Sequence, residues 1–505
     1  MKTGKINFRW MQRVVVLCIV VIVSSEAATA EPVRDGLVWL VSQHDPCGNW
    51  GDPTTTSYRD TCVALDALRE LGIRDINCSG AWPRGISWLT DVNNPAPNWE
   101  YLSREMILRV AADYNDPNID QQRDELIAGR HGSGYYCWGA EEGYNGDVMD
   151  TVQILKGLDA SWAGGYLECD DVDGSEWEDT YFLYIPPDAN TLVFYTTSYV
   201  GLIDIRFRFG DGQYWWIDDW NPNWYMWFGP GSSPPLEKDC LFEVGIRNSQ
   251  VNPSQYCLRL KYVTSDFNVV TDGKFIDETL CALVIKHPDF NTVVSINDDY
   301  GWGLVYQYPS SVFFTAQAVL ALQEYWPYIL LFPEIPGPEW DFANYPGFSW
   351  LYSFFASGNF FSYLSNHQNP DGGFGDGGQS TVYETALSHQ ALKLVGPWND
   401  YMVAARNYLE QAHDANDGSW NQSIYETALA LQVLGPLEET CDITGDLNCD
   451  CSVNIMDLYR FAMHWLESGC GPSNGWCGGT MLGSDEIVNM DDFAEFAKNW
   501  LVGIE

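Results

Sequence analysis

Four carboxylates recur at one register of a repeated motif, and they are the best candidates for acid–base chemistry. Glu384 and Glu426 lie in two copies of Tyr-Glu-Thr-Ala-Leu, and Asp60 and Asp150 precede the matching threonines of weaker copies. Two carboxylates in different environments can act as the proton donor and the base of glycosidic bond cleavage. The alternative is that each acid stabilises the first turn of a helix, where the helix dipole favours negative charge.

Aromatic side chains accompany these acids. Each full copy has a glycine-rich loop with an aromatic residue before the helix, and in three copies a tyrosine stands one or two positions before the acid. Aromatic rings beside a few polar groups are typical of ligand-binding clefts, here one for sugars. The alternative is that the loops hold helical hairpins together. The expected substrate-binding residues are Tyr58, Trp138, Trp302, Tyr383, Tyr425 and Trp420.

The clearest metal signal lies near the C-terminus. Residues 446–457 supply side-chain oxygens at loop positions 1, 3, 5, 9 and 12, and a backbone carbonyl is expected at position 7. This is calcium spacing, because Ca²⁺ takes about six to eight oxygen ligands from one tight turn. The expected ligands are Asp446, Asn448, Asp450, Ser452, Asn454 and Asp457.

A second, degenerate loop follows. The segment from Val488 to Leu501 repeats the segment from Val453 to Leu466, including a closing Trp-Leu pair. Met481 and Gly483 occupy the first two ligand positions of this loop, so we expect its calcium to rest on the three oxygen-bearing side chains that remain. These are Asp485, Asn489 and Asp492.

Paired helices must position the four repeated acids. A threonine and a leucine seven residues later recur in five copies, and seven residues are two helical turns, so both side chains face the same buried side. The pairs are Thr61/Leu68, Thr151/Leu158, Thr315/Leu322, Thr385/Leu392 and Thr427/Leu434, with Ser103/Val110 as a poorer sixth. A repeat of this length predicts stacked helical hairpins. Six hairpins can close a ring without exposed ends, so we expect an α/α toroid over residues 31–160 and 272–436.

The last two copies resemble a known superfamily. Asp371-Gly-Gly-Phe374 and Asp417-Gly-Ser-Trp420, each followed by Tyr-Glu-Thr-Ala-Leu, are similar to repeats of the squalene/hopene cyclase and protein prenyltransferase superfamily. The resemblance implies the toroid fold. The activity is not carried over, because the cyclase Asp-x-Asp-Asp acid does not occur at these helix starts, and Glu384 and Glu426 fill the place of the zinc-binding histidine.

A change of period marks an inserted domain. Apolar and charged residues alternate in Ile203–Phe209 and again in Leu258–Tyr262, which predicts strands with one solvent-facing side. Turn residues such as Pro186-Pro187 bound these runs. We therefore expect an antiparallel β-sandwich over residues 165–264. The run Asp204-Ile-Arg-Phe-Arg-Phe-Gly resembles pre-peptidase C-terminal β-sandwich domains.

The paired loop–helix units of residues 441–505 resemble type I dockerin domains. The resemblance implies a small α-helical, EF-hand-like module that binds Ca²⁺ and a cohesin-like receptor protein. Dockerins occur in polysaccharide-degrading assemblies, so the resemblance also implies polysaccharide as a ligand. Cys451 stands where such loops usually have glycine.

The N-terminus indicates export. Basic residues precede an apolar run from Val14 to Val23, and Ala28-Thr29-Ala30 is a small-x-small cleavage site, so residues 1–30 are expected to be a signal peptide. A membrane anchor is the alternative, but a span needs about 20 apolar residues. We expect bacterial export to an extracellular or cell-surface location, without a stable membrane span after cleavage.

The net charge of −43 argues against nucleic acid as a partner, since such a surface repels phosphate backbones. One of the 14 cysteines, Cys18, lies in the expected signal, which leaves 13. In an oxidising compartment these can form disulfides, and an odd number leaves at least one thiol free or joined to another chain.

Two hypotheses follow. The first is a carbohydrate-active enzyme, a polysaccharide lyase or glycoside hydrolase, that uses acids at the mouth of the ring. The second is a non-catalytic binding or scaffold protein that is anchored through its dockerin-like module. They differ in whether two carboxylates with different protonation are needed, or only aromatic rings and hydrogen-bond donors. A terpene cyclase is a third, disfavoured hypothesis.

Overall fold

The computed structural model describes most of the chain between residues 32 and 502. The positions outside the described residues are 1–31, 46, 53–55, 75–76, 114–115, 131–136, 141–145, 173–178, 201–202, 211, 221–224, 230–231, 249–253, 265, 267–274, 277–278, 281–282, 284–295, 306–307, 332–358, 394–399, 436–442, 449–451, 472–474, 483–485 and 503–505. The expected signal peptide is among them. In the described part of the chain, no helix is long and apolar enough to cross a membrane.

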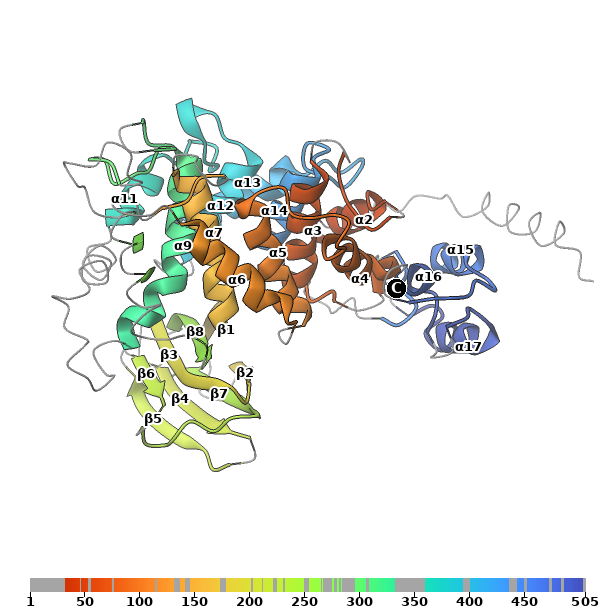
Figure 1. Ribbon diagram of the computed structural model, residues 1–505, viewed down its shortest axis with the longest axis horizontal. Coiled ribbons are helices and arrows are strands. Elements are labelled where there is room, and N and C mark those ends of the chain that lie inside the picture. The colour runs from red at the N-terminus through yellow and green to blue at the C-terminus, as the bar shows by residue number, and fades with distance from the viewer. Residues whose placement is uncertain are drawn as a thin grey trace, which may run out of the picture.

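Six helices carry the repeated threonine or serine, and they form the centre of the molecule (Figure 1). They are α3 (Ser57–Glu70), α5 (Trp99–Ala112), α7 (Val148–Trp162), α9 (Val312–Leu331), α12 (Val382–Leu392) and α14 (Ile424–Leu434). Each helix packs against the next one in this order, and α14 packs against α3. The series therefore closes on itself, and we refer to these six helices as the ring.

A second set of helices packs on the outside of the ring. These are α2 (Pro32–Ser42), α4 (Asn77–Leu89), α6 (Asn118–Gly129), α11 (Asn359–Asn366) and α13 (Asp400–Ala412). Each contacts one or two ring helices, as α6 does with α5 and α7. The outer helix expected before the fourth ring helix lies largely outside the described residues. A short 3₁₀ turn, η1 (Asp376–Gly378), follows the loop after α11.

The repeated threonines hold the loops to the ring helices. In five hairpins the threonine Oγ1, which is fully buried, accepts the backbone N–H of the loop aromatic residue at 2.8 to 3.1 Å. In four of these hairpins the aromatic residue is a tryptophan, whose indole N–H donates to a leucine carbonyl of the outer segment at 2.7 to 3.0 Å. Each loop is thus bonded to both sides of its hairpin. These bonds explain why an aromatic loop residue and a threonine recur together, which helix periodicity alone does not require.

Two four-stranded antiparallel sheets lie between α7 and α9 in the sequence. One sheet has the order β1-β8-β3-β6, and the other has β2-β7-β4-β5. The strands are β1 (Ala163–Val172), β2 (Asp179–Ile185), β3 (Ala189–Val200), β4 (Ile203–Phe209), β5 (Trp215–Trp220), β6 (Tyr225–Phe228), β7 (Cys240–Asn248) and β8 (Ser254–Thr264). Apolar residues of both sheets form one buried cluster, in which Phe207 of β4 meets Phe228 of β6 with ring centroids 5.2 Å apart.

Buried ion pairs join the sheets to the ring. Lys261 of β8 donates to both carboxylate oxygens of Asp159 on α7 at 2.7 Å, and to the backbone carbonyl of Glu324 on α9 at 2.6 Å. Arg259, also on β8, pairs with the Glu324 carboxylate. Lys261 is only 2% exposed. Burying a charge is costly unless it is paired and hydrogen-bonded, and these contacts meet that requirement.

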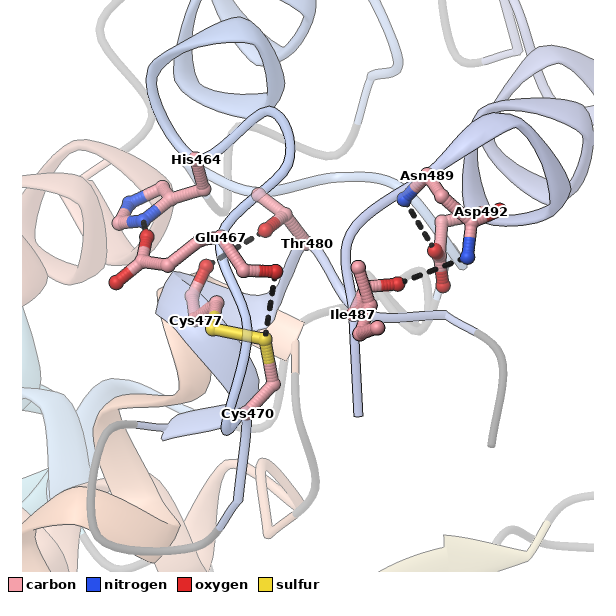
Figure 2. The surroundings of a disulfide bond; sticks show 8 residues. All are labelled: His464, Glu467, Cys470, Cys477, Thr480, Ile487, Asn489 and Asp492. Atoms are coloured by element: carbon pink, nitrogen blue, oxygen red, sulfur yellow. Dashed lines mark hydrogen bonds and ion pairs between the residues drawn. A yellow bond between two sulfur atoms is a disulfide. The ribbon is translucent and has the colours of Figure 1, made fainter. Parts of the chain in front are cut away.

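The C-terminal residues form a module with internal symmetry. Its two main helices, α15 (Ile455–Met463) and α17 (Met490–Lys498), begin with equivalent capping boxes, and a short helix, α16 (Gly475–Gly479), packs on α4. The two halves exchange backbone bonds in the same way: Val453 N–H donates to Val502, and Val488 N–H donates to Glu467. The disulfide Cys470–Cys477 closes the connection between them (Figure 2). The repeat seen in the sequence is therefore a structural repeat.

Candidate functional site at the mouth of the ring

The four repeated acids all lie in the first turn of ring helices. Asp150, Glu384 and Glu426 stand three residues after an N-cap residue, and the N-cap side chain accepts the backbone N–H of the acid in each case. Helix initiation therefore accounts for the position of these three acids. It does not account for their electrostatic environment. We call this end of the ring, where the N-termini of the helices gather, the mouth.

Electrostatic coupling links acids of neighbouring helices across the mouth. Burial raises the pKa of Tyr383, and the charges of Glu384 and Glu426 raise it further. Burial likewise raises the pKa of Tyr425 on α14, where Glu100 and Asp60 add to the effect and two arginines oppose it. Tyr383 and Tyr425 thus each lie close to acids from two helices.

The pKa of Asp150 is raised by its surroundings. Burial, then the charge of the N-cap residue Asp147, raises its pKa to about 8, and Glu100 on α5 adds to the effect. Burial also raises the pKa of Asp147, whose Oδ1 accepts the Asp150 backbone N–H at 2.8 Å. Two carboxyl groups this close do not both ionise readily. A carboxylic acid kept neutral in this way can donate a proton.

Glu384 and Glu426 have different hydrogen-bond partners. The Thr381 hydroxyl donates to Glu384 Oε2 at 2.6 Å, and burial, reinforced by Asp376, raises the pKa of Glu384. Glu426 Oε2 instead accepts the side-chain amide of Asn421 at 2.5 Å. Asn421 has a φ of 56°, a left-handed conformation that non-glycine residues seldom adopt. Asparagine tolerates this conformation better than most other residues, because its short polar side chain can hydrogen-bond locally.

Six side chains at one register surround the mouth and stay partly exposed. They stand two residues before each repeated threonine or serine, and we call them the collar: Arg59, Tyr101, Met149, Phe313, Tyr383 and Tyr425. Neighbouring members touch, since Arg59 lies 4.9 Å from the Tyr425 ring centroid, and the rings of Phe313 and Tyr383 are 5.8 Å apart. Four of the six are aromatic, and that composition suits contact with the apolar faces of a ligand.

The tryptophans do not face the mouth. Trp138, Trp302 and Trp420 were expected to bind substrate, but all three have no exposed surface. Their indole N–H groups bond to the outer segments, and their backbone N–H groups bond to the repeated threonines. The alternative interpretation of these loops, as staples of the hairpins, accounts for the observed geometry. Sequence alone does not separate the two, because a glycine–aromatic loop has the same composition in either role.

Tyr58 is also part of the core. It is 7% exposed, and its hydroxyl bonds to Glu105 on α5, which also accepts Gln122 at 2.7 Å and Arg109 at 2.7 Å. Of the expected substrate-binding residues, only Tyr383 and Tyr425 are therefore partly exposed at the mouth. The other collar residues were missed, although the register of the repeat could have identified them.

A cavity of about 220 Å³ lies away from these acids, where the C-terminal ends of α5 and α7 meet β8. Its lining includes Asp116, Asp120, Arg123, Tyr262 and Asp266. Arg123 pairs with Asp120 at 2.6 Å, and Asp116 pairs with Arg109 at 2.6 Å, so its charges are largely satisfied within the protein. We assign the candidate site to the mouth, because the perturbed acids and the partly exposed aromatic residues lie there.

Several oxygen-bearing side chains of the expected calcium loop are buried. Asp446 is 1% and Asp457 0% exposed, and Asn448 is 9% exposed. Asp457 Oδ1 accepts the backbone N–H of Leu447 at 2.7 Å, and its Oδ2 accepts that of Asn454 at 2.8 Å. Buried carboxylates in one oxygen-rich loop fit a hard cation. Ser452 is partly exposed beside Asn454, whose side-chain amide donates to its hydroxyl at 2.7 Å.

Parts of both calcium loops lie outside the described residues, namely Asp450 in the first and Asp485 in the second. Among the residues that are described, no three His, Cys, Asp or Glu side chains form a metal-binding group. In the second loop, Asp492 is fully buried and accepts the backbone N–H of Asn489 at 2.8 Å, which matches Asp457 in the first. Figure 2 shows this contact beside the disulfide.

Comparison with models of protein families and with curated proteins finds no match to this chain.

Proposed function

We propose that the protein binds or breaks down polysaccharide at the mouth of the ring and is anchored by its C-terminal module. In this proposal the ring with its outer helices is an α/α toroid, and the two packed sheets are an inserted β-sandwich. The observation that carries it is the combination, at one end of the ring, of partly exposed aromatic collar residues and acids whose pKa values are raised.

In this proposal Glu384 and Glu426, the two acids near Tyr383, act as the general acid and the general base. Glu384 has a raised pKa and is the proton donor, while Glu426, fixed by Asn421, accepts a proton from water or from the sugar. Asp150, whose pKa is also raised, is a second candidate proton donor, and Asp60 is ion-paired to Arg59 at 2.9 Å. General acid–base cleavage of a glycan requires one group that donates a proton and another that accepts one.

The C-terminal module is proposed to be a calcium-dependent, dockerin-like plug for a cohesin-like receptor. The support is the structural repeat of α15 and α17 and the buried oxygen ligands of the first loop. When bound, Ca²⁺ would be held by the residues of 446–457 and would neutralise the buried carboxylates. We also propose that residues 1–30 direct export of the protein.

A screen of plant and algal polysaccharides tests the function. Reducing-end release reports hydrolysis, and absorbance of unsaturated products reports lyase activity. We expect Glu384→Gln and Glu426→Gln each to lower turnover by about 100-fold or more, because general acid–base catalysis contributes that much. Glu410→Gln, on the outer helix α13, is the matched control with unchanged turnover.

The same variants separate the two hypotheses. The partly exposed aromatic collar favours a binding role as well, since rings alone can hold a sugar. If the wild-type protein retains a polysaccharide without releasing products, and Glu384→Gln retains it equally well, then the non-catalytic binding role holds. If no polysaccharide is bound or cleaved, the function proposed for the mouth fails.

A further inference from the structure

Lys156 faces the interior of the ring. It stands five residues after Thr151, on the same face of α7 as the collar residue Met149, and it is partly exposed. The residues at this register in the other ring helices are Asp66, Leu108, Leu320, Gln390 and Gln432. The Lys156 ammonium is under the electrostatic influence of Asp66, which lies on α3, a helix two places away in the ring. A side chain on α7 can be close both to the adjacent ring helices and to α3 only if it points into the ring. We therefore place Lys156 in the interior.

The amine of Lys156 has a neutral partner. Its Nζ donates to the side-chain carbonyl of Gln317 on α9 at 3.0 Å. Among the described residues, no carboxylate lies within ion-pair distance of it. Lys261 provides the contrast, because it is buried and bonds to both carboxylate oxygens of Asp159 at 2.7 Å.

The charged groups around Lys156 are already paired with other residues. Asp66 pairs with Arg69 at 3.3 Å, Arg104 pairs with Glu100 at 2.9 Å, and Glu324 pairs with Arg259. Burial, then the positive charge of Arg104, lowers the pKa of Lys156 to about 8, although Glu324 and Asp66 act in the opposite direction. About one amine in ten is therefore neutral at pH 7, which is about 300 times the fraction for an ordinary lysine.

We propose that Lys156 is a reactive amine inside the ring that captures the carbonyl carbon of an aldehyde. As an extension that rests on the proposed function, the natural aldehyde is the open-chain reducing end of a neutral glycan that enters past the collar. A neutral ligand fits better than an anion, because Glu100 and Glu426 lie near the collar tyrosines at the entrance and the chain as a whole is strongly acidic.

The chemistry requires no further reagent. The nitrogen lone pair attacks the carbonyl carbon and forms a C–N bond, and the carbonyl electron pair moves to oxygen, which takes up a proton. The nitrogen loses its proton, and water then leaves to give the imine. Gln317 can accept the hydrogen of the neutral amine at its present position, which keeps the lone pair directed elsewhere.

Reductive trapping tests the amine directly. The full-length protein is incubated with glycolaldehyde and sodium cyanoborohydride at pH 7, and labelling of each lysine is followed by peptide mass spectrometry. We expect Lys156 to be labelled at least about tenfold faster than Lys498, which is exposed and paired with Glu495, because its larger neutral fraction outweighs its restricted access. Lys261 is the buried internal control and should be labelled more slowly than either.

Two results would overturn the assignment: Lys156 labelled no faster than Lys498, or labelled as slowly as Lys261. The variant Lys156→Arg keeps the charge and the donor to Gln317, so it should fold normally while the fast-labelled peptide disappears. Raising the pH from 7 to 9 should increase the rate at Lys156 by about tenfold and then level off, whereas the rate at Lys498 should continue to rise.

A second arm separates this inference from the proposed function. Neutral reducing disaccharides replace glycolaldehyde under the same conditions. Trapping of both probes at Lys156 supports the amine and its glycan role together. Trapping of glycolaldehyde but of no disaccharide leaves the reactive amine established and contradicts reducing-end capture.

Discussion

The hydroxyl oxygen of Thr427 accepts the backbone N–H of Trp420 at 3.0 Å, and Thr427 has no exposed surface. The same bond joins Thr385 to Phe374 at 2.8 Å in the preceding hairpin. Each repeated threonine therefore satisfies a buried loop N–H that would otherwise lack a partner. The contact is the same in all five hairpins, although the threonine follows the loop aromatic residue by 7, 11 or 13 positions.

The first prediction concerns this contact. Thr427→Val keeps the shape of the side chain but removes the acceptor, so the Trp420 N–H is left unsatisfied. We expect the free energy of unfolding to fall by about 1 to 3 kcal/mol. Urea denaturation followed by tryptophan fluorescence measures it. Thr427→Ser restores the acceptor and should recover much of the loss; a serine variant as unstable as the valine variant would argue against the hydrogen bond.

The second prediction concerns the junction between sheet and ring. Asp159→Asn leaves Lys261 buried with one charged partner fewer, and we expect about 3 to 5 kcal/mol of destabilisation. Thermal unfolding is a suitable measurement. Glu495→Gln removes the exposed partner of Lys498 and should change stability by less than about 1 kcal/mol. Equal effects of the two substitutions would show that the junction contributes no more than a surface pair.

The third prediction concerns pH. The pKa of Asp150 is about 8 in the folded protein, compared with an ordinary value of 3.8, so the folded state binds this proton more tightly. The contribution to stability is fully present below about pH 4 and is lost as the pH rises through 8. Each tenfold gain in proton affinity corresponds to about 1.4 kcal/mol.

Asp150→Asn mimics the protonated acid and should remove this part of the pH dependence. Urea denaturation at intervals between pH 5 and 9 compares the two proteins. We expect the variant to gain stability relative to the wild type as the pH rises. A constant difference across this range would mean that Asp150 titrates normally.

The fourth prediction concerns calcium. Addition of Ca²⁺ to the chelator-treated full-length protein should raise the unfolding temperature of the C-terminal module, because binding to the folded state alone stabilises it. Asp457→Ala should abolish the response in calorimetric titration. Asp491→Ala, an exposed residue next to the buried Asp492, is the control and should bind normally. Binding that survives the loss of both Asp446 and Asp457 would place the ion elsewhere.

Much of the helical framework was predictable, because Thr and Leu seven residues apart report one buried helix face. The strand Ile203–Phe209 was predictable from its alternation of apolar and charged residues. Arg206 and Arg208 are partly exposed as expected, but Asp204 is buried and pairs with Arg247. The closed packing order was expected from the number of hairpins, and α14 does pack against α3. Both periodicities are local consequences of backbone geometry.

The interior of the ring was not predictable in the same way. Lys156, Arg104 and Glu324 are charged residues on a helix face that sequence periodicity assigns to solvent, and only closure of the ring makes that face internal. The opposite error affected Trp138 and Trp302, whose loops have the composition of a ligand platform but are buried. Sequence periodicity indicates which face of a helix is polar. Whether that face contacts solvent or another part of the protein depends on the tertiary structure.

The contact between α3 and α14 also has a consequence for biosynthesis. Gln432 on α14 bonds to the backbone carbonyl of Val63 on α3, although more than 360 positions separate them. During translation α3 is synthesised long before α14. The apolar surface of α3 that α14 covers therefore stays exposed until the last hairpin leaves the ribosome. A nascent chain that stops before residue 424 should consequently depend on chaperones, while release of the last hairpin allows the circle to be completed in one cooperative step.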